Sequence, residues 1–294
     1  NHLTNMANTY PAATLADIIM SSEMLALQNK HLPFDKFCTD FSNEAVAVSP
    51  NGTGARSTIQ VDLVGSGSTV QTNPTNYESG DATVTAVSVG MNEYSSAFHI
   101  TAAERNNGRK LEKLLGANMH GLLDKLDSVA STLFTVANFG AVVLDKDPTT
   151  VTAADIKTLI AASGKYNQRN LITDAVFWAQ FAATSDKNSL GVMDGAYGLD
   201  SMSYATDWSN AGTNVNGIIA DTTALACATR LPLNDDAVRE VIDIALIELP
   251  NGMTAQIAQW VSTASRATWN SIDIVAGFQV GDATAGGIIE DGTA

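Results

Sequence analysis

The chain has 294 residues with 16 basic and 31 acidic side chains, so its formal net charge is −15. This acidity, with no basic run longer than Arg109-Lys110, argues against a groove that follows nucleic-acid phosphates. No apolar run approaches the ~20 residues of a membrane-spanning helix, and no signal-peptide pattern opens the chain. Cys38 and Cys227 lie far apart without metal-type spacing, which favours free thiols in a protein that is not secreted. Asn1 is not a natural first residue, so we expect that residues upstream of it were removed, lost by processing or left out of the sequence.

The N-terminal stretch is predicted to begin as an irregular polar arm over residues 1–13. Residues 14–29 have the spacing of a short amphipathic helix, which would pack either on its own domain or on a neighbouring chain. Aromatic residues at helical spacing follow, and we expect them to lie in the core: Phe34, Phe37 and Phe41.

Residues 46–100 are dominated by Ser, Thr, Gly and Asn and predict a long two-stranded excursion. Alternating β-branched residues mark its strands at 58–63 and 83–89, and Gly-Ser and Asn-Pro turns separate them. We expect no apolar face large enough for a core, and an isolated hairpin is marginal in water. The excursion should therefore lie against another chain or be mobile, which indicates an assembly protein.

Residues 101–138 are predicted to form one long helix. Thr101 and Glu104 form a capping box, Gly140 suits the end, and at 1.5 Å per residue the helix would span roughly 55 Å. Asn106-Asn107-Gly108 leaves open a late start near Arg109 or a bend. Its expected buried face carries Leu111, Leu115, Met119, Leu122, Leu126, Val129, Leu133 and Val136.

Helices and short strands are predicted to alternate from about residue 146 to residue 232, which is typical of a compact α/β unit. After Pro232 we expect mainly strands. One predicted helix begins at Thr152 and has Ile156, Leu159 and Ile160 on one face. Another begins at Asp174 and carries Val176, Phe177 and Phe181. A third begins at Asp221 and runs through Thr229. The predicted strands are 171–173, 199–206, 217–220, 238–249, 253–262 and 271–280, with a hairpin turn at Asn251-Gly252.

No catalytic, cofactor-binding or metal-binding residues are predicted, so we expect a protein that is not an enzyme. The histidines show no ligand spacing: His2, His31, His99 and His120. The glycines of Gly52-Thr53-Gly54 are expected to form a turn, because a phosphate-binding loop needs a strand before it and a helix after it. The carboxylates of Asp235, Asp236 and Glu240 are expected on a solvated face.

Three stretches in this order resemble the major capsid protein of tailed bacteriophages, whose shell fold is shared with encapsulins and the herpesvirus capsid floor. They are Tyr94 to Thr101 with the helix after it, Gly217 to Ala226, and Asp273 to Val280. The resemblance implies an α+β major-capsid fold. Its expected parts are an N-terminal arm (1–48), an extended β-hairpin loop (49–99), a peripheral domain with a long spine helix (100–145), an α/β axial domain (146–265) and peripheral return strands (266–294).

The resemblance also implies a structural function. The chain would assemble with itself as pentamers and hexamers into an icosahedral shell around double-stranded DNA, without sequence-specific contact to that DNA. Expected partners are a portal protein, a scaffolding protein and a decoration or cementing protein, with no membrane and no cofactor. The location would be the virion capsid, assembled in the host cytoplasm. The alternatives are the shell of an encapsulin-type compartment and, from another class, an unrecognised hydrolase.

Some capsids of this family join a lysine of the extended loop to an asparagine of a neighbouring subunit, with a glutamate taking protons. Between Lys36 and Lys110 this chain has no lysine. Arg56 cannot replace it, because a guanidinium stays protonated and does not attack an amide. The sequence therefore predicts a shell held by non-covalent contacts.

Overall fold

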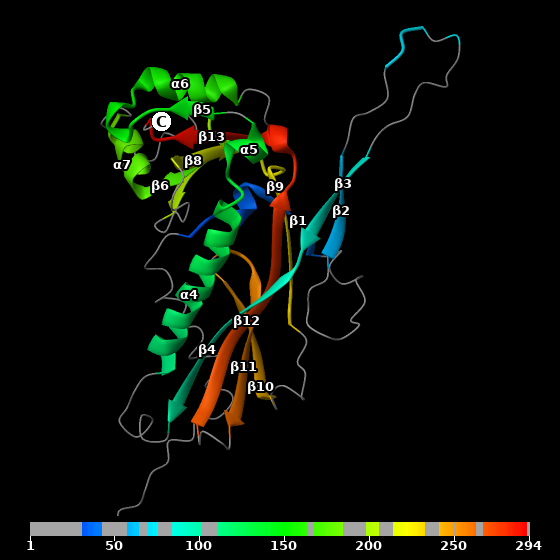
Figure 1. Cartoon of the computed structure of the whole chain (residues 1–294), viewed down its shortest axis with the longest axis vertical. Coiled ribbons are helices and arrows are strands. Elements are labelled where there is room, and N and C mark those ends of the chain that lie inside the picture. Colours follow the sequence, from blue (N-terminus) through cyan, green and yellow to red (C-terminus); the bar gives the residue numbers. More distant parts are fainter. Residues whose placement is uncertain are drawn as a thin grey trace, which may run out of the picture.

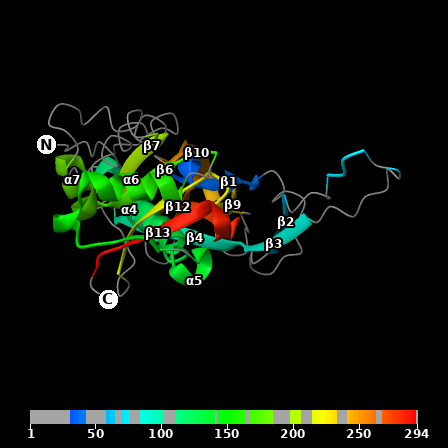
Figure 2. The ribbon, with the colours of Figure 1, turned by 90° about the horizontal axis from the view of Figure 1, so that it is seen from above.

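The computed structural model describes residues 31–42, 58–64, 70–73, 75, 84–101, 111–140, 142–163, 167–184, 198–205, 214–232, 241–249, 251–262 and 267–292. These residues form two sheets with helices beside them and a two-stranded hairpin that projects from one side (Figures 1 and 2). The predicted α+β class is confirmed. The helix predicted over 14–29 lies outside the described residues.

The larger sheet has six strands, ordered β1-β9-β12-β11-β10, with β4 pairing on the other side of β12. The smaller has five, ordered β5-β13-β8-β6-β7, and β2 pairs with β3 in the hairpin. The bounds in the larger sheet are β1 Cys38–Asp40, β4 Asn92–Thr101, β9 Leu225–Arg230, β10 Val241–Glu248, β11 Thr254–Ser262 and β12 Ala267–Val280. Those in the smaller sheet and hairpin are β5 Val142–Asp145, β6 Asn170–Asp174, β7 Ser201–Ala205, β8 Val215–Ala220, β13 Gly286–Glu290, β2 Thr58–Val64 and β3 Val84–Gly90.

Strand β12 organises the larger sheet because it pairs with three other strands. Its first half lies between β4 and β11, and its second half pairs with β9. The prediction of a strand over 271–280 is confirmed, and the strand begins earlier, at Ala267. Most of β4 falls in the range predicted as the extended loop, 49–99, yet β4 pairs with β12 along its whole length.

The hairpin β10–β11 forms as the sequence predicts. Gly252 has φ +83°, the left-handed conformation that favours glycine, and its amide donates to the carbonyl of Leu249. The amide of Leu249 donates to the carbonyl of Met253 across the turn. The predicted Asn251-Gly252 turn is therefore confirmed.

The long helix is shorter than predicted. It is α4, Leu111–Ser131, with 21 residues and a length of about 31 Å. Thr101, the predicted cap, instead ends β4 and pairs with Ala267, because extended pairing with β12 competes with a local capping box. Residues 102–110, which include the late start near Arg109 that the sequence left open, lie outside the described residues. A separate short helix, α5 (Val136–Phe139), follows, and Gly140 ends it at φ +67°.

The buried face of α4 lies where the periodicity places it from Leu115 to Leu126, but Val136, which was predicted on the same face, is exposed and begins α5. Leu115, Met119, Leu122 and Leu126 are buried, and Leu123 and Ala130 widen the face. These side chains pack on β4 and β12 in the main hydrophobic core, which includes Phe98, Ile272 and Ile274.

Helices α6 (Ala153–Ala162) and α7 (Ala175–Thr184) lie beside the smaller sheet (Figure 1). The predicted helix start at Thr152 is confirmed, and a capping box of Thr152 and Asp155 begins α6. The carboxylate of Asp174 accepts the amide of Phe177 at 2.6 Å and so caps α7, again as predicted. A second core joins these helices to one face of the sheet and contains Leu144, Val151, Ile156, Leu159, Leu171, Phe177, Leu199, Ile219 and Ile289. Short 3-10 turns complete the described elements: η1 Phe34–Lys36, η2 Pro148–Thr150 and η3 Ala283–Ala285.

The prediction of a helix from Asp221 through Thr229 is wrong. Asp221 begins a tight turn, in which its carbonyl accepts the amide of Ala224 at 3.0 Å, and strand β9 follows. The alanines of this stretch favour a helix locally, but β1 and β12 lie on either side of β9 and supply its backbone hydrogen bonds. The stretch taken as strand-then-helix is therefore strand-turn-strand.

Strand β13 was not predicted, since the tail offers only small and acidic residues around Ile288-Ile289. It lies between β5 and β8 and returns the chain end to the smaller sheet. The predicted range 266–294 thus contains strands of both sheets, as does the range 146–265.

The described start of the chain passes through the core. The ring centroid of Phe34 lies 5.0 Å from that of Phe278, and Phe37 lies 5.3 Å from Phe134. Strand β1 then pairs in parallel with β9. The core role predicted for Phe34 and Phe37 is confirmed, although both fall within the range predicted as an arm, 1–48.

Candidate assembly surface

The base of the hairpin β2–β3 is packed on the chain's own larger sheet. Ile59, Val61, Val89 and Met91 are buried there. They form a third core with residues of β9 and β12, namely Ala226, Ala228 and Val275. The prediction that the excursion has no apolar face large enough for a core is therefore wrong at its base, where small alanines let the hairpin approach closely.

Beyond its base the hairpin leaves the body of the molecule (Figures 1 and 2). The two strands pair from Thr58 with Gly90 to Val64 with Val84. Thr58, Gln60 and Asp62 are exposed. An isolated two-stranded hairpin is marginal in water, so contacts with another molecule would stabilise this projecting part.

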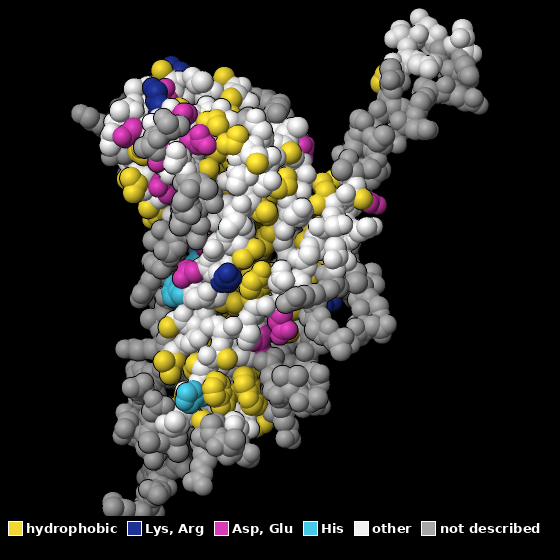
Figure 3. Space-filling view, in the orientation of Figure 1, with side chains coloured by type: hydrophobic (Ala, Val, Ile, Leu, Met, Phe, Trp, Pro, Cys, Tyr) yellow, Lys and Arg dark blue, Asp and Glu magenta, His cyan; other side chains and the backbone are white. Residues whose placement is uncertain are grey.

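A second exposed feature is an apolar stripe on β10, formed by Ile242, Ile244 and Leu246. Their exposed fractions are 65%, 46% and 58%. β10 is an edge strand in the described sheet, and such an edge with apolar side chains is a typical site for contact with another chain. Figure 3 shows hydrophobic side chains gathered toward the end of the larger sheet that lies away from α6 and α7. The period-two pattern of residues 242–246, which predicts a strand, is also the signal for this stripe.

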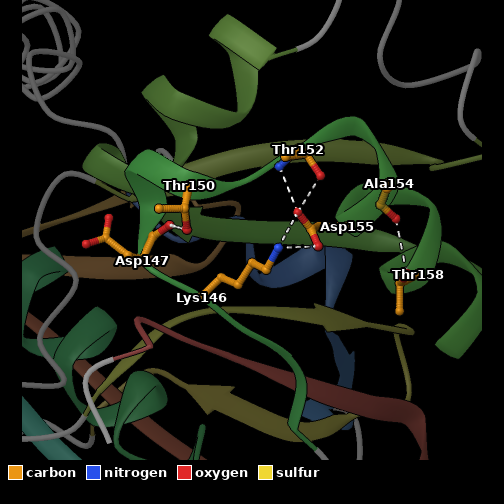
Figure 4. Close-up of polar contacts among 7 residues, drawn as sticks. All are labelled: Lys146, Asp147, Thr150, Thr152, Ala154, Asp155 and Thr158. Carbon is orange, nitrogen blue, oxygen red and sulfur yellow. Dashed lines mark hydrogen bonds and ion pairs between the residues drawn. The ribbon is translucent and has the colours of Figure 1, made fainter.

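A polar cluster joins β5 to α6 (Figure 4). The ammonium of Lys146 lies 2.8 Å from Oδ1 of Asp155, and the amide and hydroxyl of Thr152 donate to Oδ2 at 2.8 and 2.6 Å. The hydrogen bonds from Lys146 and then Thr152 lower the pKa of Asp155 to about 2. The cluster fixes the start of α6. The sequence predicted the helix start at Thr152 but not the contributions of Asp155 and Lys146.

The structure brings together two histidines that the sequence separates by 89 positions. Nε2 of His31 lies 3.3 Å from Nδ1 of His120, and Nδ1 of His31 lies 2.8 Å from Oδ2 of Asp127. Burial raises the pKa of Asp127. His99 instead packs on Trp269, with ring centroids 4.7 Å apart. No local spacing could have predicted the first contact, because it joins the start of the described chain to α4.

Cys38 and Cys227 are free and buried on the neighbouring strands β1 and β9, and burial raises the pKa of the Cys38 thiol. Within the described ranges, no group of three or more His, Cys, Asp or Glu side chains is arranged to hold a metal ion. No described helix is long and apolar enough to cross a membrane. The remaining sequence candidates lie outside the described residues: His2, Gly52-Thr53-Gly54, Asp235, Asp236 and Glu240.

Comparisons with known proteins show which solved structures share this architecture. No family model and no curated protein matches the sequence. A structure from Mycobacterium phage Che8 is similar with a TM-score of 0.55 and 13% identity, covering 91% of this chain and 93% of that chain. The capsid structure of cyanophage P-SCSP1u gives a TM-score of 0.57 at 11% identity, covering 90% and 89%.

A third similar structure is the virus-like particle from Pyrococcus furiosus, with a TM-score of 0.56 and 12% identity, covering 93% of this chain and 98% of that chain. At such identities the likeness concerns the fold, and it extends over nearly the whole of each chain. The resemblance predicted from the order of elements is therefore confirmed at the level of the fold: this chain has the major-capsid fold of phage shells.

Proposed function

We propose that this chain is the structural subunit of an icosahedral shell, assembling as pentamers and hexamers around the double-stranded DNA of a tailed phage. The observation that carries the proposal is the hairpin β2–β3, which is anchored on the subunit at its base and projects from it beyond. Its exposed strands and the apolar stripe of β10 give one subunit two separate surfaces for neighbours. A shell with closed symmetry needs more than one contact surface on each subunit, because each copy must contact several others.

The parts of the subunit follow the two sheets. We assign the smaller sheet with α6 and α7 to the axial domain, and the larger sheet with α4 to the peripheral domain. The hairpin beyond its buried base is the extended loop. This assignment moves β4 out of the loop and β9 to β11 out of the axial range 146–265.

The proposed location is the virion capsid, with assembly in the host cytoplasm. Portal, scaffolding and decoration or cementing proteins are the proposed partners beside the chain itself. The net charge of −15 supports a lumen that does not retain DNA on its wall. The role is structural rather than catalytic.

The test shortens the hairpin without touching its base. Val64 pairs with Val84, so replacing residues 65–83 by Asn-Gly closes the two strands with a two-residue turn. We expect a folded subunit with the thermal unfolding midpoint of the wild type that forms no closed shells in electron micrographs. Lys125→Ala, at an exposed position of α4, is the matched control and should assemble normally. Normal particles from the shortened chain would refute the role of the hairpin.

A larger deletion, over 52–88, would be less informative. It removes β2 and most of β3, and with them Ile59, Val61 and the cover of Ala226 and Ala228. We expect that deletion to destabilise the subunit itself, so failed assembly would have two causes.

The second candidate is the shell of a protein compartment without a genome. The similarity to the virus-like particle from Pyrococcus furiosus, over 98% of that chain, supports it. Nucleic-acid content separates the two candidates. Purified particles from the native source that contain nuclease-protected double-stranded DNA support the phage shell, and particles that contain protein cargo without DNA support the compartment.

A further inference from the structure

Strand β13 completes the smaller sheet from within. It lies between β5, to which it runs parallel, and β8, to which it runs antiparallel (Figure 1). β5 pairs with β13 and with no other strand among the described residues. In the sequence, however, β13 follows all the other described strands of both sheets. β5 therefore has no strand partner in the smaller sheet until the chain has been made as far as Glu290.

The space that β13 occupies excludes side chains at two consecutive positions. A methyl group at Gly286 would come 2.5 Å from a ring carbon of Phe139, and one at Gly287 would come 2.6 Å from a methyl of Val143. Phe139 is itself buried, so its ring has little room to move. Gly286 has φ −135°, an extended conformation that any residue adopts. The close packing, and not the backbone conformation, therefore requires glycine there.

The next two residues supply the apolar contacts of the strand. Ile288 and Ile289 are both fully buried, and they enter different cores because successive side chains of a strand point to opposite faces. Ile288 belongs to the main core with α4 and the larger sheet, and Ile289 belongs to the second core with α6 and α7. Insertion of this one strand therefore adds contacts to both cores.

Backbone hydrogen bonds hold the strand at both ends. The amide of Asp221 donates to the carbonyl of Ala285 at 2.8 Å, and the amide of Lys146 donates to the carbonyl of Glu290 at 3.1 Å. Where a strand is added to a sheet, main-chain hydrogen bonds provide affinity and the space for alternate side chains provides specificity. The surroundings of β13 have both properties.

We propose that β5 and β8 form a strand-acceptor site that selects the sequence Gly-Gly-Ile-Ile of residues 286–289, and that insertion of this strand is the last step in completing the subunit. The site accepts the same segment as a separate peptide when the chain's own strand is kept out. The proposal concerns the single subunit and does not depend on the proposed shell function.

The first test uses the full chain with Gly286→Val and Gly287→Val together, which keeps its own strand out of the site. A fluorescent peptide with the wild-type sequence of residues 283–292 should bind this variant saturably, as measured by anisotropy. A peptide carrying the same two valines is the matched control and should bind at least about tenfold more weakly, because it overpacks both contacts. The wild-type chain, whose site is occupied, should also bind the wild-type peptide at least about tenfold more weakly. A folded double variant that binds neither peptide, or binds both equally, would overturn the proposal.

The second test uses the wild-type chain and does not require the double variant to fold. Hydrogen exchange is followed in urea below the unfolding midpoint. A strand that inserts last should open first, so the amides of β13 and β5 should exchange together and at least about tenfold faster than those of β12. Equal exchange rates in β13 and β12 would overturn the proposal, whatever the double variant does.

Discussion

Gly277 of β12 lies directly against the backbone of Gly90, where the hairpin β2–β3 meets the larger sheet. A methyl group at Gly277 would come 2.6 Å from the carbonyl oxygen of Gly90 and 2.8 Å from a methyl of Val89. No side chain fits at this crossing without moving the backbone of one strand. The absence of a side chain at Gly277 therefore lets the projecting hairpin rest on its own subunit.

The first prediction tests that crossing. Gly277→Ala should lower the free energy of unfolding of the unassembled subunit by about 1–3 kcal/mol, because overpacking displaces the hairpin base. Urea unfolding measures it. Gly121→Ala is the matched control, since Gly121 is exposed on α4 with nothing within 4 Å, and should raise stability by up to about 1 kcal/mol. Equal effects of the two substitutions would contradict the close approach.

The second prediction concerns the buried face of α4. Leu126→Ala should lower the free energy of unfolding by about 2–5 kcal/mol, through lost burial and the cavity left behind. Leu122→Asp buries an unpaired charge and should give insoluble or unassembled protein. Lys125→Ala, exposed on the same helix, should stay within about 0.5 kcal/mol of the wild type. A soluble, assembling Leu122→Asp variant would show that this face is not a core.

The third prediction follows from the lowered pKa of Asp155, which is about 2. A carboxylate whose pKa is lower in the folded state stabilises the fold above its unfolded pKa of about 3.9 and loses that contribution as the pH falls toward 2. Asp155→Asn should therefore lower stability at pH 7, and the difference should shrink between pH 4 and pH 2. The effect should stay below about 1 kcal/mol, because the ion pair with Lys146 is partly exposed.

Urea unfolding at pH 7, 4 and 3 measures the Asp155 effect. Lys146→Met serves as the partner variant, since it removes the cation but leaves both hydrogen bonds from Thr152. It should give a smaller loss than Asp155→Asn. A difference between wild type and Asp155→Asn that is the same at all three pH values would refute the role of this carboxylate.

The fourth prediction concerns how mature particles are held together. The stretch between Lys36 and Lys110 has no lysine, so the hairpin cannot supply the amine for an amide cross-link to a neighbour. Intact particles boiled in detergent and run on a denaturing gel should give a single band near 30.8 kDa. A ladder of covalent pentamers and hexamers would refute non-covalent assembly.

Local chemistry was sufficient for much of the fold. The apolar spacing of α4, the capping box of Thr152 and Asp155 and the cap of Asp174 each act within one or two turns of helix. The Asn251-Gly252 turn is equally local, because it needs only a residue that tolerates a positive φ. Each of these features depends only on residues that are close in the sequence, so the sequence predicts it. The order of these elements was also enough to predict the capsid fold.

The remaining features of the fold depend on pairing between strands that lie far apart in the sequence. The alanine-rich stretch after Asp221 became strand β9 because β1 and β12 supply its hydrogen bonds, and Thr101 became the end of β4 for the same reason. The contacts of the candidate surfaces are also tertiary: the hairpin base rests on Gly277, and His31 meets His120 across 89 positions. The sequence by itself determined where helices and turns can form. The tertiary structure decided which extended segments pair, because a strand is stabilised by partners that its own sequence does not contain.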